Sequence, residues 1–237
     1  MIKLNHIKAI KPFTNRTILS IKPLTQQGHA NTIYLLKTEQ KKYILREFKI
    51  KIDRKMEFKV QKKTHKQKIA SEAILLEENL MISEFLEGNH KEKLSQQELK
   101  KIAQLLKKLH KIKIRQKQNS FKSNFSFNHK KAKKAFMILD RQKREYALGH
   151  NDLHPQNIIF NKKTIKLIDW EYARYSDIYF DLVSIIIEYK LNKKDTKTFL
   201  QSYFGKKSIN HKKIDAYTII YKELWKLWFK KLAKGEL

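Results

Sequence analysis

The sequence predicts an α+β fold, with short strands at the start of the chain and helices after them. Residues 17–48 form short runs typical of strands, separated by polar turns. Beyond residue 95, apolar side chains recur at the spacing of a helix that buries one face. A length of 237 residues allows one large domain or two smaller lobes.

The N-terminal part is expected to be a small antiparallel β lobe. Its strands are expected at residues 17–21, 32–37, 41–48, 74–76 and 80–82. The loop between the first two contains Gln27 and Gly28, and a glycine there lets backbone N–H groups approach a phosphate. A helical stretch begins near Glu57, and the segment with Glu84 and Phe85 follows the last strand.

The rest of the chain is expected to be mainly helical. Ser95 and Glu98 form a capping box that opens a helix, and the apolar face that follows is core. Further helices are expected at residues 128–143, 181–189, 196–204 and 213–234, and a β-hairpin at 158–160 and 165–168.

Three polar residues surround this hairpin at separations that suit phosphate chemistry. Asp152 lies in the preceding loop, where its carboxylate is able to accept a proton. Asn157 and Asp169 stand at the two ends of the hairpin, and their oxygens are hard ligands of the kind that Mg²⁺ prefers. Phosphoryl transfer needs little beyond positioning and charge neutralisation.

The spacing His150-x-Asp152-x-x-x-x-Asn157, with an acid after the hairpin, resembles the catalytic and metal-binding segments of the protein-kinase-like fold. The His-Pro pair after Asp152 is similar to that of aminoglycoside phosphotransferases and choline kinases. Residues 168–173 read Ile-Asp-Trp-Glu-Tyr-Ala and resemble the signature of the choline and ethanolamine kinase family.

This resemblance implies a two-lobed protein-kinase-like fold that uses ATP and Mg²⁺. Residues 1–84 would form the nucleotide-binding lobe and residues 85–237 the catalytic and acceptor-binding lobe. Asp152 would be the catalytic base, and Asn157 and Asp169 would hold the metal. The residues expected to bind ATP are Gln27, Gly28, Arg46, Glu57, Glu84 and Phe85. The residues expected to support the catalytic loop are His150 and Asp181.

The acceptor pocket is expected to suit a cationic alcohol. Trp225 and Trp228 lie one helical turn apart on one face, an arrangement that is as readily core when no other context is considered. The resemblance implies that they contact a trimethylammonium group, and an aromatic ring over a desolvated cation contributes about 0.5–2 kcal/mol. The other residues expected to bind the acceptor are Asp152, Glu171, Tyr172 and Glu188.

Composition restricts the cellular setting and the partners. The chain has no cysteine, so it offers neither disulfides nor thiolate metal ligands. It shows no signal peptide and no apolar stretch long enough to cross a bilayer, so a cytoplasmic location is expected. The net charge of +30 suggests a polyanionic partner. However, the excess is almost all lysine, spread along the whole chain, so no specific nucleic-acid partner is expected.

The function expected from these observations is ATP- and Mg²⁺-dependent phosphorylation of the hydroxyl of a small amino alcohol, choline first. Ethanolamine, thiamine and aminoglycosides are the alternative acceptors, because each carries a cationic amine near a hydroxyl. An alternative from another class is a basic protein on an inactive kinase scaffold that binds nucleic acid or membranes. Peripheral membrane contact and the oligomeric state stay open.

Overall fold

The computed structural model describes residues 4–25, 31–115, 121–125 and 129–235. It has the α+β composition that the sequence predicts, and it divides into two compact units, Met1–Glu87 and Gly88–Leu237. The sequence placed a boundary after residue 84. Each unit is described by itself below.

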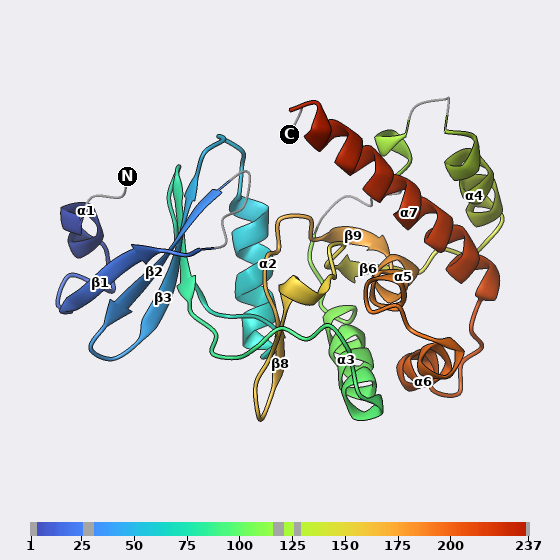
Figure 1. The fold of residues 1–237 in the computed structure, drawn as a ribbon, viewed down its shortest axis with the longest axis horizontal. Helices are drawn as coiled ribbons and strands as arrows, with labels where there is room; N and C mark the ends of the chain where they lie inside the picture. Colours follow the sequence, from blue (N-terminus) through green and yellow to red (C-terminus); the bar gives the residue numbers. More distant parts are fainter. Residues whose placement is uncertain (1–3, 26–30, 116–120, 126–128, 236–237) are drawn as a thin grey trace. The chain divides into compact units, whose positions relative to one another are not determined.

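The first unit is an antiparallel sheet with flanking helices (Figure 1). Its elements are α1 (Leu4–Ala9), β1 (Ile18–Pro23), β2 (Asn31–Thr38), β3 (Lys42–Phe48), α2 (Lys55–Lys66), β4 (Ala73–Leu76) and β5 (Leu80–Glu84). The strands lie in the order β1-β2-β3-β5-β4, so β3 is central.

The two faces of this sheet bury different side chains because neighbouring residues of a strand point to opposite sides. On one face, Leu45 and Ile82 pack with Ile7 of α1, which the sequence did not predict as a helix. On the other face, Phe48 and Met81 pack with Phe58 of α2. Arg46 follows Leu45 in β3 and therefore points to the α2 side.

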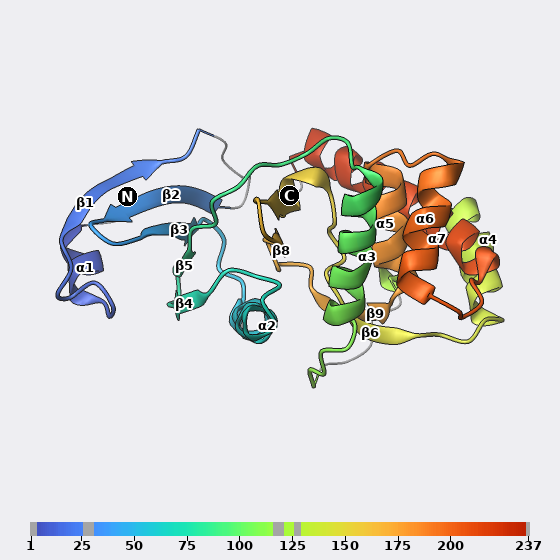
Figure 2. The ribbon, with the colours of Figure 1, turned by 90° about the horizontal axis from the view of Figure 1, so that it is seen from below.

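The second unit is mainly helical, with two small two-stranded sheets (Figure 2). Its elements are α3 (Gln96–Leu109), α4 (Lys130–Asp140), β6 (Tyr146–Gly149), β7 (Ile158–Phe160), β8 (Ile165–Leu167), β9 (Arg174–Asp177), α5 (Tyr179–Glu188), α6 (Lys193–Phe204) and α7 (His211–Ala233). Helix α3 packs on α6, and α7 packs on α4 and α5. Ser95 and Glu98 form the predicted capping box at the start of α3.

Strands β6 and β9 form a ladder that the sequence did not predict. This ladder closes the loop that carries His150, Asp152 and Asn157. Tyr146 pairs with Asp177 and Gly149 pairs with Arg174. The segment 150–173 therefore starts and ends at the same end of this ladder. The fully buried ammonium of Lys213, in α7, lies 2.9 Å from the Asp177 carboxylate and secures this ladder to the helical core. A buried pair of this kind costs several kcal/mol to break.

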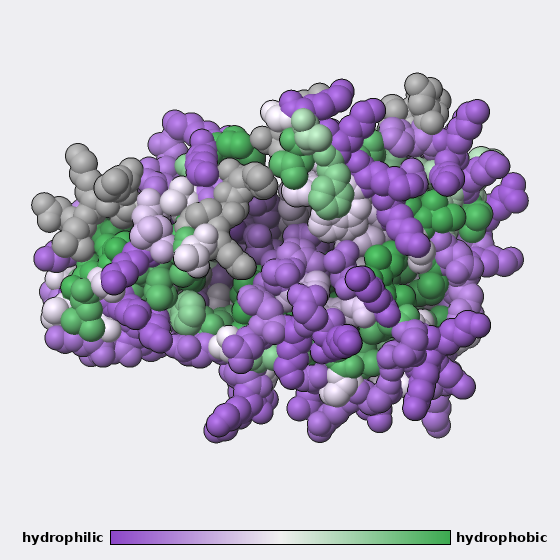
Figure 3. Space-filling model, in the orientation of Figure 1, coloured by the Kyte–Doolittle hydropathy of each residue, from purple (hydrophilic) through white to green (hydrophobic). Residues whose placement is uncertain are grey.

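Hydrophilic side chains cover most of the face in Figure 3, as a net charge of +30 requires. Hydrophobic side chains gather over the C-terminal end of α7 on the same face (Figure 3). In the described part of the chain, no helix combines the length and the apolar character that crossing a bilayer would need.

Candidate active site

Asp181, in the first turn of α5, fixes the loop that follows β6. Its two carboxylate oxygens accept the backbone N–H groups of His150 and Asn151, each at 2.8 Å. The Nε2 atom of the buried His110 ring lies 3.1 Å from the same carboxylate. Burial alone would oppose ionisation, but His110, His150 and the Asn151 N–H outweigh it and hold the pKa of Asp181 below its usual range.

Two residues of this loop meet special backbone demands. A side chain at Gly149 would lie 2.7 Å from the Ser176 hydroxyl, so the close approach of β6 to β9 needs glycine. Asn151 adopts the left-handed conformation, with φ of 65°, which asparagine tolerates better than most residues. Its side chain accepts the Ser176 hydroxyl at 2.6 Å and donates to the Tyr172 carbonyl at 3.1 Å.

The backbone of Ile168 ties the loop to the far end of the hairpin. His150 donates its Nε2 hydrogen to the Ile168 carbonyl at 2.9 Å, and the Ile168 N–H donates to the Asn157 carbonyl at 3.0 Å. The residue after Ile168 is Asp169, which is left-handed with φ of 62°. Strained backbone of this kind concentrates at functional sites, where the surrounding structure holds it.

Asp152 and Asn157 are in direct contact. The Asn157 side-chain N–H₂ donates to both the backbone carbonyl and the Oδ2 atom of Asp152, at 2.9 Å each. The Asp152 side chain is only 22% exposed. Burial raises the pKa of Asp152, and the Asp169 charge adds to the rise, while His154 and His150 oppose it. Asp152 is thus a carboxylate whose proton affinity exceeds that of an ordinary aspartate.

The donor set suits a magnesium ion. Asn157 uses its amide nitrogen on Asp152, so its Oδ1 oxygen is the atom left for a cation. The Ile168 N–H donates to the Asn157 carbonyl at 3.0 Å, so the backbone of Asp169, the next residue, begins close to Asn157. Few protein oxygens suffice, because Mg²⁺ keeps several waters. Asn157 and Asp169 would hold the ion.

Helices α5 and α7 bring an acid next to a group of aromatic rings. Tyr221 of α7 donates its hydroxyl to Glu188 of α5 at 2.9 Å. The Trp225 ring packs against Trp228, with centroids 5.5 Å apart, and stacks on Phe229. Both indoles are half-buried rather than enclosed in the core. Burial raises the pKa of Tyr221, and the charges of Glu188 and Asp152 raise it further.

Tyr172 lies three residues after Asp169 in the sequence, and it is 42% exposed. Burial of its hydroxyl raises its pKa, followed by the charges of Glu171, Asp152 and Asp169. Arg174 packs beside it, with the guanidinium 6.0 Å from the ring centre. Tyr172 therefore lies within electrostatic range of the Asp152 and Asp169 carboxylates.

In the first unit, Glu57 of α2 is shared by two arginines. Arg46 of β3 contacts one carboxylate oxygen and Arg54 lies 3.2 Å from the other. All three side chains are largely buried. The Arg46–Glu57 contact is an ion pair, and the second arginine adds a positive charge of the kind that a phosphate matches.

Glu84 is the last residue of β5 and Phe85 follows it, and the backbone N–H groups of both have partners. The Glu84 N–H donates to the Glu72 carbonyl at 2.9 Å and the Phe85 N–H donates to the Lys42 carbonyl at 3.1 Å. Contacts with a nucleotide would therefore use other backbone atoms of this segment. Gln27 and Gly28 lie outside the described residues.

The sequence analysis missed the supporting residues of the site. These are Arg54, His110, Asn151, Ser176, Tyr221 and Phe229. Asn151 carried a usable signal, because asparagine directly before a loop acid often marks left-handed backbone. The others act across long sequence separations and carry no local signal.

A β unit with a buried arginine–glutamate pair and a helical unit with a loop acid bonded to an amide define a phosphotransferase of the protein-kinase-like type. Residues 20–217 match the Phosphotransferase enzyme family, so the chain belongs to that family.

Curated relatives and solved structures agree with this assignment. LicA from Haemophilus influenzae is 33% identical over 89 residues, 34% of this chain and 33% of that protein. The LicA homolog of Mycoplasma capricolum is 37% identical over 89 residues, 38% of this chain and 37% of that protein. The matched segments thus span about a third of the length of each relative.

The solved structures extend the likeness over nearly the whole chain. The choline kinase LicA from Streptococcus pneumoniae has a TM-score of 0.76 and 23% identity, covering 92% of this chain and 86% of that one. LicA in complex with AMP has a TM-score of 0.74 and 25% identity, covering 94% and 87%. An ethanolamine kinase from Plasmodium vivax has a TM-score of 0.73 and 21% identity, covering 94% and 78%. These values confirm the two-lobed kinase-like fold.

Proposed function

We propose that the chain transfers the γ-phosphoryl group of ATP to the hydroxyl of a small amino alcohol, with choline as the first choice. The observation that carries this proposal is the Asp152–Asn157 contact, with a raised pKa at Asp152. The solved structures that the chain resembles include choline and ethanolamine kinases and a complex with AMP, which support this class of acceptor and an adenine nucleotide.

In the proposed reaction, Asp152 accepts the hydroxyl proton as the oxygen forms a bond to the γ-phosphorus and the bond to the ADP oxygen breaks. Because burial raises the pKa of Asp152, its carboxylate is a stronger base than that of an ordinary aspartate. Arg46, held by Glu57, would contact the nucleotide phosphates. Mg²⁺ held by Asn157 and Asp169 would neutralise phosphate charge.

Choline is favoured over primary amines because of the aromatic group on α7. Trp225 and Trp228 offer half-buried ring faces, and Glu188 supplies a carboxylate bonded to Tyr221 nearby. Tyr172 and Glu171 complete the proposed pocket. A quaternary ammonium cannot donate hydrogen bonds, so ring faces and an acid are the groups that recognise it. The nearby acids determine the electrostatic potential in the pocket, because salt screens the charge of lysines that lie further than about 8 Å away.

The test is ADP release from ATP and Mg²⁺ with choline, ethanolamine, thiamine and an aminoglycoside as separate acceptors. The proposal predicts turnover with choline at the highest kcat/KM. Higher kcat/KM with another amine would replace the acceptor but keep the reaction. No turnover with any of them, together with saturable RNA or membrane binding, would favour an inactive scaffold.

A further inference from the structure

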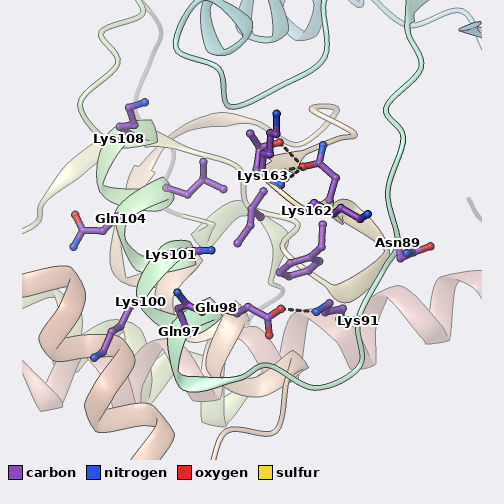
Figure 4. Close-up of a pocket in the computed structure, with 15 residues that line it drawn as sticks. Asn89, Lys91, Gln97, Glu98, Lys100, Lys101, Gln104, Lys108, Lys162 and Lys163 are labelled. Atoms are coloured by element: carbon purple, nitrogen blue, oxygen red, sulfur yellow. Dashed lines mark hydrogen bonds and ion pairs between the residues drawn. The ribbon is translucent and has the colours of Figure 1, made fainter.

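A second concave site lies between α3, the turn of the β7–β8 hairpin and the chain at Asn89 (Figure 4). Its volume is about 710 Å³, which is the size of a small-molecule site. All of its lining residues belong to the second unit, and none of them is a residue of the proposed active site.

The lining is strongly basic. It contains six lysines and a single acid: Lys91, Lys100, Lys101, Lys108, Lys162, Lys163 and Glu98. Glu98 is already paired with Lys91. Lysines elsewhere in the chain pair with acids where these are close, as Lys42 does with Glu87. Within the described residues, Lys100, Lys101, Lys162 and Lys163 have no ion-pair partner. Figure 4 shows Lys100 pointing away from the cavity, so Lys101, Lys162 and Lys163 are the unpaired lysines that remain around it.

Hydrogen bonds and close backbone contacts hold the elements that carry these lysines. The chain at Asn89 exchanges two backbone hydrogen bonds of 2.9 Å with Phe160, and a side chain at Gly88 would lie 2.5 Å from the Phe160 carbonyl oxygen. The side chain of Asn161 accepts the N–H groups of Lys163 and Thr164 and thereby fixes the hairpin turn. The capping box fixes the start of α3. Figure 4 shows Lys101 and Lys162 on opposite sides of the cavity that these elements enclose.

We propose that this pocket binds a small soluble anion with at least two phosphate groups. One phosphate carries a charge of about −1.5 to −2 near neutral pH, so a single one would leave part of the charge of these three ammonium groups unbalanced. The volume also exceeds what one phosphate fills. Lysine suits phosphate as a mobile point charge. A free ligand can enter this concave site more readily than the flat surface of a membrane can.

The test is equilibrium titration of the full chain with inorganic tripolyphosphate, without Mg²⁺, at physiological salt. The pocket variant carries Lys101→Gln, Lys162→Gln and Lys163→Gln. The control variant carries Lys193→Gln, Lys194→Gln and Lys197→Gln, which remove the same charge from exposed positions on α6. We expect the pocket variant to lose one bound tripolyphosphate per chain, or to bind it about tenfold more weakly. The control variant should match the wild type.

Equal binding by both variants would overturn the proposal, because the anion would then respond only to overall charge or to the nucleotide site. Co-sedimentation with phosphatidylglycerol vesicles separates the other source of phosphate. If the pocket variant loses vesicle binding while tripolyphosphate binding is unchanged, the surface contacts membranes and the proposal is wrong. ATP turnover with choline is measured on the same variants and should be unchanged, so this test and that of the proposed function fail separately.

Discussion

His150 donates its Nε2 hydrogen to the carbonyl of Ile168 at 2.9 Å, and this bond joins the two halves of the candidate active site. On one side, the His150 N–H donates to the Asp181 carboxylate, and Asp152 lies two residues further along the chain. On the other side, Ile168 precedes Asp169. The placement of Asp152 relative to Asp169, the proposed base and the proposed metal ligand, is therefore set by the buried side chains of His150 and Asp181, which hold the backbone on either side.

The pH dependence of kcat/KM should report the raised pKa of Asp152. The base works only when ionised, so kcat/KM should fall as pH is lowered, with a midpoint above the ordinary aspartate value of about 3.9. Replacing His154 by Gln removes a charge that lowers this pKa, so the midpoint should move further up. A midpoint at or below the ordinary value in the wild type would contradict the account.

Asp152→Asn should stabilise the protein while it removes activity. Burial raises the folded-state pKa of Asp152 above the unfolded value, so stability is lost as pH rises between the two and stays lower above them. A neutral amide avoids this cost. We expect a higher urea midpoint for Asp152→Asn at pH 7 and none of this gain below the unfolded pKa. Destabilisation at pH 7 would show that the charge of Asp152 supports the fold.

Asp181→Asn should destabilise the protein at pH 7, in contrast to Asp152→Asn. Its pKa is lowered in the folded state, so its stabilising contribution is present above the unfolded pKa of about 3.9 and is lost as pH falls through the folded value. Removing the charge at pH 7 leaves His110 and two N–H groups poorly paired, and should cost about 3–5 kcal/mol in urea unfolding. A cost below about 1 kcal/mol would show that the loop does not depend on this anchor.

Arg54→Gln should weaken ATP binding without affecting the acceptor. Arg54 supplies one of the two arginine charges beside Glu57, so its removal lowers the positive charge next to the proposed phosphate contact of Arg46. We expect a higher KM for ATP and an unchanged KM for choline, with Arg54→Lys recovering part of the loss because it restores the charge but not the fork. Equal changes in both KM values would indicate a general loss of structure, which urea unfolding would detect.

Trp225→Leu should raise the KM for choline about 2- to 30-fold, because one ring face over a cation is worth about 0.5–2 kcal/mol. The matched control is 3,3-dimethylbutan-1-ol, an uncharged alcohol with the shape of choline. Its KM should change much less, since only the cation gains from the ring's electrostatics. A similar rise for both alcohols would assign Trp225 to packing instead.

The sequence predicted those parts of the fold whose signals are local. The capping box at Ser95 placed the start of α3, and the apolar triplets on either side of a polar turn placed the β7–β8 hairpin. The ladder between β6 and β9 was missed because its partners are separated by the whole catalytic loop. Helix α1 was missed because its apolar residues are few and gain their stability from packing on the sheet.

The candidate site divides in the same way. Asp152, Asn157 and Asp169 were found because their separations along the chain are short and fixed by the hairpin. The link from Glu188 through Tyr221 to Trp225 depends on how α5 and α7 pack, and no sequence spacing reveals it. The placement of Gln27 and Gly28 on a phosphate stays a prediction.

The most direct test of the central claim is phosphorus NMR of ATP, Mg²⁺ and choline incubated with the wild type and with Asp152→Asn. The account predicts that the wild type forms phosphocholine and ADP in equal amounts, and that the variant forms neither above background. ADP without phosphocholine, or equal phosphocholine from both proteins, would contradict the role of Asp152 as the base that accepts the acceptor's proton.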